Sequence, residues 1–246
     1  MEVLGIDIGG SGIKGTIVDT NKGEFLKERH RIPTPQPATI DDIAETVKAI
    51  VDHFKFEGPV GCGFPSVIQN GVVKTASNIH KSCINVNVDE VFGHITGLPV
   101  RVFNDADAAG AAELQFGCVK GYKGLAIFLT IGTGIGSAII NQGQLIPNSE
   151  LGHVYLDNGM KTEHFASDAV RKKEDLSRKE WGERFNIVLK YFDKLFYPDL
   201  FVLGGGSSKK FHKYAETITV KTPVKPAELL NQAGIIGAAL LASRAL

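Results

Sequence analysis

Asp7 stands directly before a run rich in glycine near the start of the chain. Glycine turns let several backbone N–H groups converge on an anion, and a carboxylate at a strand end can hold a hydrated Mg²⁺ that bridges phosphates. The run matches neither a P-loop nor a dinucleotide fingerprint, and a plain hairpin would explain the glycines equally well. The preceding aspartate favours phosphate binding. The candidate residues for this role are Gly9, Gly10, Ser11, Gly12 and Lys14.

Two later glycine runs have similar properties. Gly132, Thr133 and Gly134 form the first, in which the threonine hydroxyl adds a donor for phosphate. The second, with Gly204 and Gly205, precedes a predicted helix N-terminus, which is a natural anion site. A tight turn in a buried sheet is the alternative for each run taken alone. Their joint presence favours a nucleotide or polyphosphate site.

Asn104 and Asp105 stand where a predicted strand gives way to a helix. Ligands of open α/β sheets gather outside such strand ends. There Asp105 can accept a proton from a substrate hydroxyl while Asn104 orients it. Alternatively, one of the two only caps the helix, and the spacing does not decide between these interpretations.

Glu150 and His153 form a further polar group, in the segment ELGH. A lone histidine is more often a satisfied polar residue than a ligand. Beside a glutamate and a glycine, however, it can bind vicinal hydroxyls, which need both donors and acceptors. Asn78 is another candidate of this kind.

Hydrophobic patterning predicts the elements that position these residues. Strands are predicted at 3–8, 13–18, 25–32, 60–64, 100–103, 125–131, 137–140 and 200–203. Helices are predicted at 39–54, 105–116, 177–196 and 233–246. The alternation of helices and strands indicates an α/β fold. Two strand–glycine loop–strand units hint at two similar halves.

Composition excludes several classes of protein. The 246 residues allow one large domain or two small lobes. Lys plus Arg and Asp plus Glu both number 27, which disfavours a nucleic-acid binder. Apolar runs fall short of the roughly 18 residues of a membrane helix, and the N-terminus lacks the features of a secretory signal. The three cysteines form no CxxC pair, and no histidine stands near them at zinc-ligand spacing. We therefore expect a cytoplasmic protein without zinc.

Together these segments resemble the ROK family of sugar kinases, in order and spacing across nearly the whole chain. The segments are DIGGSGIKG at 7–15, GFPS at 63–66, NDADAAG at 104–110, GTGIG at 132–136, ELGH at 150–153 and LGGG at 203–206. The branch of the family that uses inorganic polyphosphate is similar in four further stretches. These are TASNIHKS at 75–82, PNSELGH at 147–153, ASDAVRKKEDLS at 166–177 and LGGGSSKK at 203–210.

The resemblance implies an α/β, two-lobed, actin-like ATPase (ribonuclease H-like) fold of the sugar-kinase type. Residues 1–104 with the C-terminal helix 233–246 would form the smaller lobe, and 105–232 the larger. Asp105 would be the general base toward the 6-hydroxyl of the sugar, and Asp7 would position Mg²⁺. Sugar-binding residues would be Gly63, Pro65, Ser66, Asn78, Asn104, Glu150 and His153. Donor phosphates would be bound by Gly9, Gly10, Ser11, Gly12, Lys14, Gly132, Thr133, Gly134, Gly204 and Gly205.

The implied activity is phosphoryl transfer from inorganic polyphosphate, with ATP or GTP as alternative donors, to the 6-hydroxyl of glucose. Glu163 is a weaker candidate for the sugar-binding glutamate that other members carry in a zinc segment absent here. An ATP-dependent kinase for another hexose or an N-acyl amino sugar, and a non-catalytic sugar-binding regulator, stay open. We expect a homodimer with no nucleic-acid or membrane partner. Extra cations for a long polyanion would be Lys81, Lys172, Lys173, Lys209 and Lys210.

Overall fold

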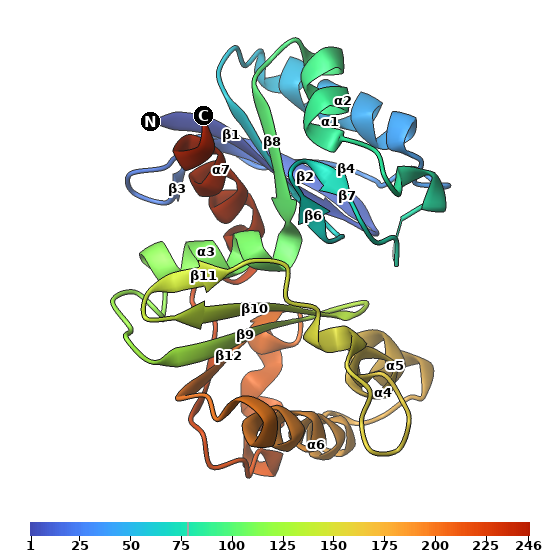
Figure 1. Cartoon of the computed structure of the whole chain (residues 1–246), viewed down its shortest axis with the longest axis vertical. Helices are drawn as coiled ribbons and strands as arrows, with labels where there is room; N and C mark the ends of the chain where they lie inside the picture. The colour runs from blue at the N-terminus through green and yellow to red at the C-terminus, as the bar shows by residue number, and fades with distance from the viewer. Residues whose placement is uncertain (78) are drawn as a thin grey trace. The chain divides into compact units, whose positions relative to one another are not determined.

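The computed structural model describes residues 1–77 and 79–246, which form two compact units (Figure 1). Unit 1 comprises Met1–Ala112 and Gln232–Leu246, and unit 2 comprises Glu113–Asn231. Each unit contains a mixed sheet with helices packed on it, as the alternation of patterns in the sequence predicts. No helix in the described part of the chain is both long enough and apolar enough to cross a membrane.

The sheet of unit 1 has the strand order β3-β2-β1-β5-β8, and β4 pairs with β2. Its strands are β1 (Glu2–Gly9), β2 (Gly12–Asp19), β3 (Glu24–Phe25), β4 (His30–Ile32), β5 (Val60–Phe64) and β8 (Val100–Asn104). Strands β1 and β2 form an antiparallel hairpin, whereas β1, β5 and β8 run parallel. The single strand predicted at 25–32 is wrong: two short strands occupy its ends. Both pair with β2.

Helices cover both faces of this sheet. They are α1 (Ile40–Phe54), α2 (Val88–Thr96) and α7 (Ala233–Ala245). Helix α3 (Asp105–Phe116) follows β8 directly and runs past Ala112, the last residue of unit 1 in this part of the chain. Helix α1 is capped at its start, since the Thr39 side chain accepts from the backbone N–H of Asp42. On the opposite face α7 lies so close to β5 that a Cβ on Gly61 would be 2.1 Å from the Ala238 carbonyl oxygen. The short elements are β6 (Ile68–Gln69), β7 (Val72–Val73) and η1 (Lys81–Cys83).

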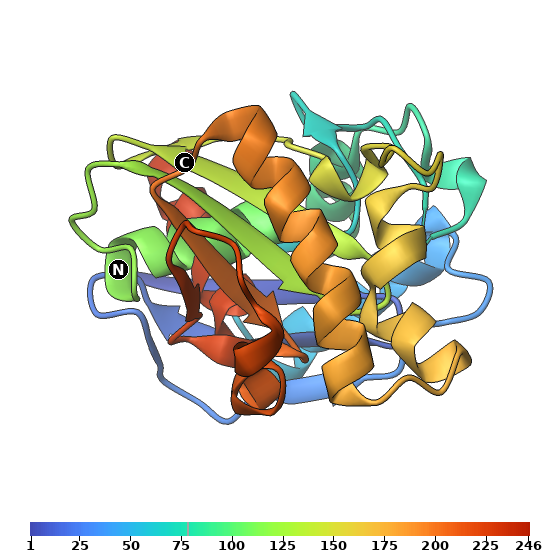
Figure 2. The same ribbon diagram turned by 90° about the horizontal axis from the view of Figure 1, so that it is seen from below.

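The sheet of unit 2 has the strand order β11-β10-β9-β12-β13. Its strands are β9 (Leu125–Ile131), β10 (Ile135–Asn141), β11 (Gln144–Ile146), β12 (Leu200–Gly205) and β13 (Val224–Pro226). The long helix α6 (Arg178–Phe196) lies across one face (Figure 2), where Trp181 and Phe185 join a core with Ile127 and Leu129. A capping box formed by Ser177 and Glu180 starts this helix.

The remaining elements of unit 2 are short. They are η2 (Leu151–His153), α4 (Thr162–Ala166), α5 (Asp168–Lys173), η3 (Ser208–Lys213), η4 (Ala215–Thr217) and η5 (Leu230–Gln232), the last of which ends at the first residue of the returning part of unit 1. The helix predicted after Gly206 is wrong, because η3 is a 3-10 segment with non-helical backbone at Lys210. The Ser208 hydroxyl bonds back to the Gly205 carbonyl at 2.7 Å and tightens this turn. The loop at Gly204 and Gly205 is therefore not followed by an α-helix whose dipole would attract an anion.

Candidate active site

Three parallel strands bring the predicted residues of unit 1 to one edge of its sheet. Asp7 on β1 pairs in register with Gly63 on β5, and Phe64 pairs with Asn104 at the end of β8. Asp105 follows as the first residue of α3. The carboxyl edge of parallel strands is where ligands of α/β sheets bind.

Asn104 organises this edge through three hydrogen bonds. Its Oδ1 accepts from the backbone N–H groups of Ala106 and Asp107, at 2.9 and 3.0 Å, and so caps α3. Its Nδ2 donates to the Ser66 carbonyl oxygen at 3.1 Å. The side chain thus has the capping role considered above, and it also joins the loop after β5 to the start of α3.

Asp105 lies beside Gly63 and is partly exposed. One carboxylate oxygen, Oδ1, accepts from the Ala106 N–H at 2.8 Å, which orients the group. An ionised carboxylate has about four lone-pair sites and can accept a proton from a hydroxyl group. Because Asn104 also receives the Ala106 N–H, α3 does not depend on Asp105 for its cap.

The loop after β5 is built around Ser66, which is buried. Its hydroxyl donates to the Thr75 carbonyl and accepts from the Thr75 N–H, the latter at 3.3 Å. Ser66 therefore fixes the loop that carries Pro65, which is half-buried. Asn78 lies outside the described residues, and its role in sugar binding stays a prediction.

The first glycine run forms the tip of the β1–β2 hairpin, where Gly9 pairs with Gly12 and Gly10 and Ser11 make an exposed turn. Lys14 on β2 places its Nζ 3.2 Å from Asp7 Oδ2. A carboxylate and a cation thus stand together beside the turn, as binding of a phosphate and its counter-ion requires.

Arg31, on the neighbouring strand β4, contacts the tip of this hairpin and was not singled out from the sequence. Its Nη2 donates to the Ser11 carbonyl at 2.7 Å, and a Cβ on Gly12 would lie 2.6 Å from its Nε. The pairing of Lys14 with Arg31 across β2 and β4 creates the contact, which only the strand register reveals. The hairpin tip therefore carries a guanidinium as well as an ammonium group.

The Asp7 carboxylate is a suitable ligand for a magnesium ion whose other ligands include phosphate oxygens of the donor. Mg²⁺ usually takes one or two carboxylates, with waters and substrate phosphates as its other ligands. In the described part of the chain no group of three or more His, Cys, Asp and Glu side chains is arranged to hold a metal ion. A cation at Asp7 would therefore depend on the donor for most of its ligands.

Unit 2 brings two glycine runs side by side. Strand β12 runs parallel to β9 with Gly205 paired to Ile131, the residue before Gly132. Gly205 has a φ of +75°, and a Cβ there would lie 2.5 Å from the Ile131 carbonyl oxygen, so only glycine fits. Gly132 and Thr133 are exposed at the tip of the β9–β10 hairpin. The two predicted donor loops of this unit thus share one edge of its sheet.

The ELGH segment is held against β10 by its backbone. The Leu151 N–H donates to Ser137 Oγ at 2.9 Å, and a Cβ on Gly152 would lie 2.1 Å from the Ile135 carbonyl oxygen. This close packing places Glu150 and His153 at either end of η2. Glycine at the third position of ELGH is therefore required by packing.

His153 lies between two carboxylates. Its Nδ1 is 3.7 Å from Glu150 and its Nε2 is 3.4 Å from Glu163 on α4. Burial raises the pKa of Glu150, His153 lowers it and the Glu163 carboxylate raises it further. A Cβ on Gly134 would meet Glu163 Oε2 at 2.5 Å, so this carboxylate also borders the glycine loop at 132–134. The group offers the mixed donors and acceptors that vicinal hydroxyls need.

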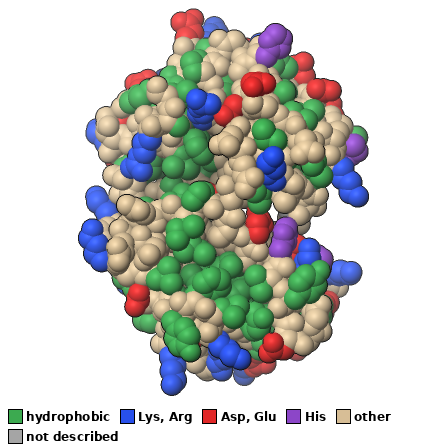
Figure 3. Space-filling view, viewed as in Figure 1, with side chains coloured by type: hydrophobic (Ala, Val, Ile, Leu, Met, Phe, Trp, Pro, Cys, Tyr) green, Lys and Arg blue, Asp and Glu red, His purple; other side chains and the backbone are tan. Residues whose placement is uncertain are grey.

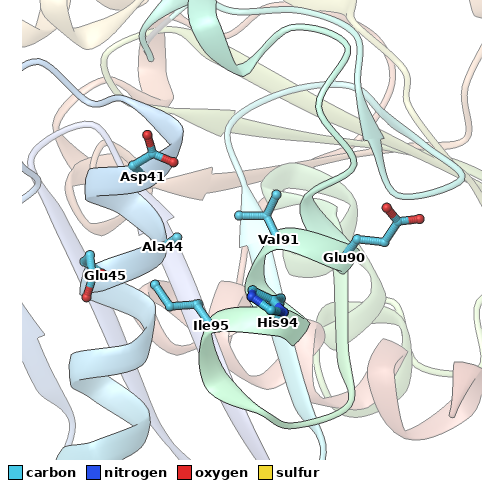
Figure 4. Close-up of a pocket in the computed structure, with 7 residues that line it drawn as sticks. All are labelled: Asp41, Ala44, Glu45, Glu90, Val91, His94 and Ile95. Carbon is cyan, nitrogen blue, oxygen red and sulfur yellow. The ribbon is translucent and has the colours of Figure 1, made fainter.

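A groove of about 480 Å³ lies between α1 and α2 and contains none of the predicted site residues (Figure 4). Its floor is apolar, with Ala44, Val91 and Ile95 facing one another. Asp41, Glu45 and Glu90 surround it and would repel a phosphate chain. The groove is therefore not the donor site.

The additional lysines predicted for a polyanion are all exposed. On the face seen in Figure 3, Lys and Arg side chains lie scattered around hydrophobic surface. Exposed hydrophobic residues of unit 2 include Ile187, Leu195 and Tyr197, in and after α6. Whether the lysines line one track stays a prediction.

Three comparisons with known proteins agree. The model of the ROK family matches residues 3–171. The chain is 45% identical over 238 residues to a polyphosphate glucokinase of Mycobacterium tuberculosis, covering 96% of this chain and 89% of that protein. It is 44% identical to an inorganic polyphosphate/ATP-glucomannokinase from Arthrobacter sp. strain KM, with a TM-score of 0.96 and coverage of 100% and 99%. A ROK family glucokinase from Streptomyces griseus shares the fold, with a TM-score of 0.86 at 24% identity over 99% of this chain and 100% of that one.

Proposed function

The chain belongs to the ROK family, and from this we propose that it transfers a phosphoryl group from inorganic polyphosphate to the 6-hydroxyl of glucose. The observation that carries the proposal is the 45% identity to a polyphosphate glucokinase over 96% of the chain. The resemblance to the family and the sugar-kinase fold, both expected from the sequence, are confirmed. A cytoplasmic homodimer remains part of the proposal.

In this proposal Asp105 takes the proton from the attacking hydroxyl. The bond from the Ala106 N–H orients its carboxylate, and a general base typically contributes about 10²–10⁴-fold to the rate. Phosphoryl transfer otherwise depends mainly on positioning and on stabilisation of charge. Magnesium, when bound at Asp7 and the donor, would neutralise charge on the phosphates.

The remaining residues would bind and orient the substrates. Glu150, His153 and Glu163 would hold sugar hydroxyls, because together they offer both donors and acceptors. The hairpin at Gly10 with Lys14, and the loops at Gly132 and Gly205, would hold the donor phosphates. Asn104 and Ser66 would act on the sugar through the loop that they fix.

Mannose is a second candidate acceptor. The structure with a TM-score of 0.96 to this chain is described as a glucomannokinase that uses polyphosphate or ATP. The same description supports ATP as a second donor. A single hydroxyl contact separates these sugars, so one or two side chains determine the preference.

A panel of donors and sugars tests the proposal. Purified protein with Mg²⁺ is assayed with polyphosphate, ATP or GTP against glucose, mannose or N-acetylmannosamine, with Asp105→Asn as the control for background activity. We expect the fastest transfer with polyphosphate and glucose. Glucose binding without turnover from any donor would instead indicate a sugar-binding regulator. Better turnover with ATP under all conditions would contradict the polyphosphate assignment.

A further inference from the structure

Helix α5 connects the two glycine loops of unit 2. It lies in the segment ASDAVRKKEDLS, to which the proposed mechanism gives no role. At its start the Ala169 N–H donates to the Gly132 carbonyl at 3.2 Å. The neighbouring Asp168 accepts from the hydroxyl of Ser207, which follows the second loop, at 3.2 Å. Two adjacent residues thus hold both loops.

Asp168 is also the centre of a cluster of cations. Its carboxylate lies 2.8 Å from Arg171 Nε, 3.1 Å from Lys172 Nζ and 3.0 Å from Arg178 Nη1. Arg178 in addition donates to Ser207 Oγ at 3.1 Å. Burial alone would raise the pKa of Asp168, but hydrogen bonds from Arg171 and Lys172 and the charge of Arg178 hold it at about 2. The carboxylate is therefore ionised at neutral pH.

This network differs from an ordinary ion pair in what it joins. Arg184 and Glu174, 2.8 Å apart, link α6 to the end of α5 as well. The contacts of that pair reach α4 and not the glycine loops. In the Asp168 network, by contrast, three cations face one carboxylate, which leaves two positive charges beside the loop that ends at Ser207.

We propose that Asp168 is a positioning residue that holds the loops at Gly132 and Ser207 in one geometry and keeps the surplus positive charge directed at the donor phosphates. The inference deepens the proposed function and rests on it for the class of donor, a polyphosphate chain. Asp168 itself does not touch the donor in this proposal. It acts through Ser207, Arg178 and the backbone at Gly132.

Whether Asp168→Asn raises or lowers the affinity for phosphate chains distinguishes a positioning role of Asp168 from a purely electrostatic one. Asp168→Asn removes a negative charge from a site for a polyanion. If net charge alone governed binding, the variant would bind phosphate chains more tightly. If positioning governs binding, the variant binds them more weakly, because a neutral amide oxygen holds Arg171 and Arg178 less tightly than a carboxylate does, and the amide NH2 cannot accept from Lys172.

The experiment measures binding of inorganic tripolyphosphate with Mg²⁺ by calorimetry, using wild type, Asp168→Asn and the matched control Glu174→Gln. The guanidinium carbon of Arg178 lies 5.8 Å from the ring centroid of Trp181, the single tryptophan of the chain. The fluorescence of Trp181 therefore reports changes around Arg178. We expect the Kd for tripolyphosphate to rise about tenfold or more in Asp168→Asn, as weakening of the hydrogen bonds that a charged carboxylate accepts predicts. We expect no change in Glu174→Gln, and an unchanged Kd for glucose in both.

Kinetics supply a second readout that a purely structural role would not give. In Asp168→Asn the KM for polyphosphate should rise while the KM for glucose stays constant, and Asp168→Glu should recover part of the loss. If Asp168→Asn does not fold, Ser207→Ala decides, because it removes the bond to Asp168 at a small buried position. We expect a raised Kd for tripolyphosphate there too.

An unchanged or lower Kd in the folded variants would overturn the inference, as would a wild type that does not bind tripolyphosphate. Failure of the proposed function looks different. If the proposed function is wrong, wild type binds tripolyphosphate but makes no glucose 6-phosphate from polyphosphate. The difference in the Kd for tripolyphosphate between wild type and Asp168→Asn still shows whether Asp168 positions the loops.

Discussion

Replacing Asp105 by Asn separates its catalytic role from a capping role. The substitution keeps the shape of the side chain and the acceptor for the Ala106 N–H, but it removes the basic carboxylate. Loss of a general base predicts a fall in kcat of about 10²–10⁴-fold. At about 1.36 kcal/mol for each factor of ten, this corresponds to roughly 2.7–5.4 kcal/mol in the barrier.

The cost in stability should be small, because Asn104 provides the cap of α3. The variant loses a negative charge in the first helical turn, worth about 0.3–1 kcal/mol. For a chain of 246 residues, 1 kcal/mol shifts Tm by about 2–4 °C. Asn104→Ala is the matched contrast. It removes the cap, worth about 0.5–2 kcal/mol, and leaves the buried Ser66 carbonyl without its Asn104 donor, at about 1–3 kcal/mol.

The assay combines initial rates of glucose 6-phosphate formation with thermal unfolding and with calorimetric binding of glucose. We expect Asp105→Asn to bind glucose normally, to unfold within a few degrees of wild type and to be nearly inactive. Asn104→Ala should lose several times more stability. Turnover of Asp105→Asn within tenfold of wild type, at normal stability, would refute the assignment of Asp105 as the base.

Three further outcomes are expected. Glu163→Gln should raise the KM for glucose. The substitution also removes the negative charge that helps to raise the pKa of Glu150, so the acidic limb of the pH–rate profile should move to lower pH. An acidic limb that moves to higher pH or stays fixed would exclude an effect of Glu163 on Glu150. Gly61→Ala should destabilise the protein by roughly 1–3 kcal/mol, because the added methyl group would overlap the Ala238 carbonyl oxygen. The control Gly93→Ala, in α2, has space for its methyl group and should be neutral or stabilising. Equal melting temperatures of the two variants would argue against the close packing of α7. The KM for polyphosphate should rise more steeply with salt than the KM for ATP if the exposed lysines add screened contacts, and parallel salt dependence in the two titrations would exclude them.

Much of the site could be predicted from the sequence because its parts are local. The β1–β2 hairpin, the caps of α1 and α6 and the start of α3 each depend on residues a few positions apart, so composition and spacing indicate them directly. The helix predicted after Gly206 failed for a local reason as well. The Ser208 hydroxyl bonds to the Gly205 carbonyl and closes a tighter turn there.

The tertiary structure decided which of these parts meet within each unit. Register between β9 and β12 brings Gly205 beside Ile131, and the pairing of β2 with β4 places Arg31 on the hairpin tip. Packing of α4 against η2 brings Glu163 within 3.4 Å of His153. Such contacts join segments far apart in the chain, and they form only when burial of the sheets and of α6 selects one register. The sequence therefore determined the chemical groups and their local turns, and long-range packing determined the partners of each group.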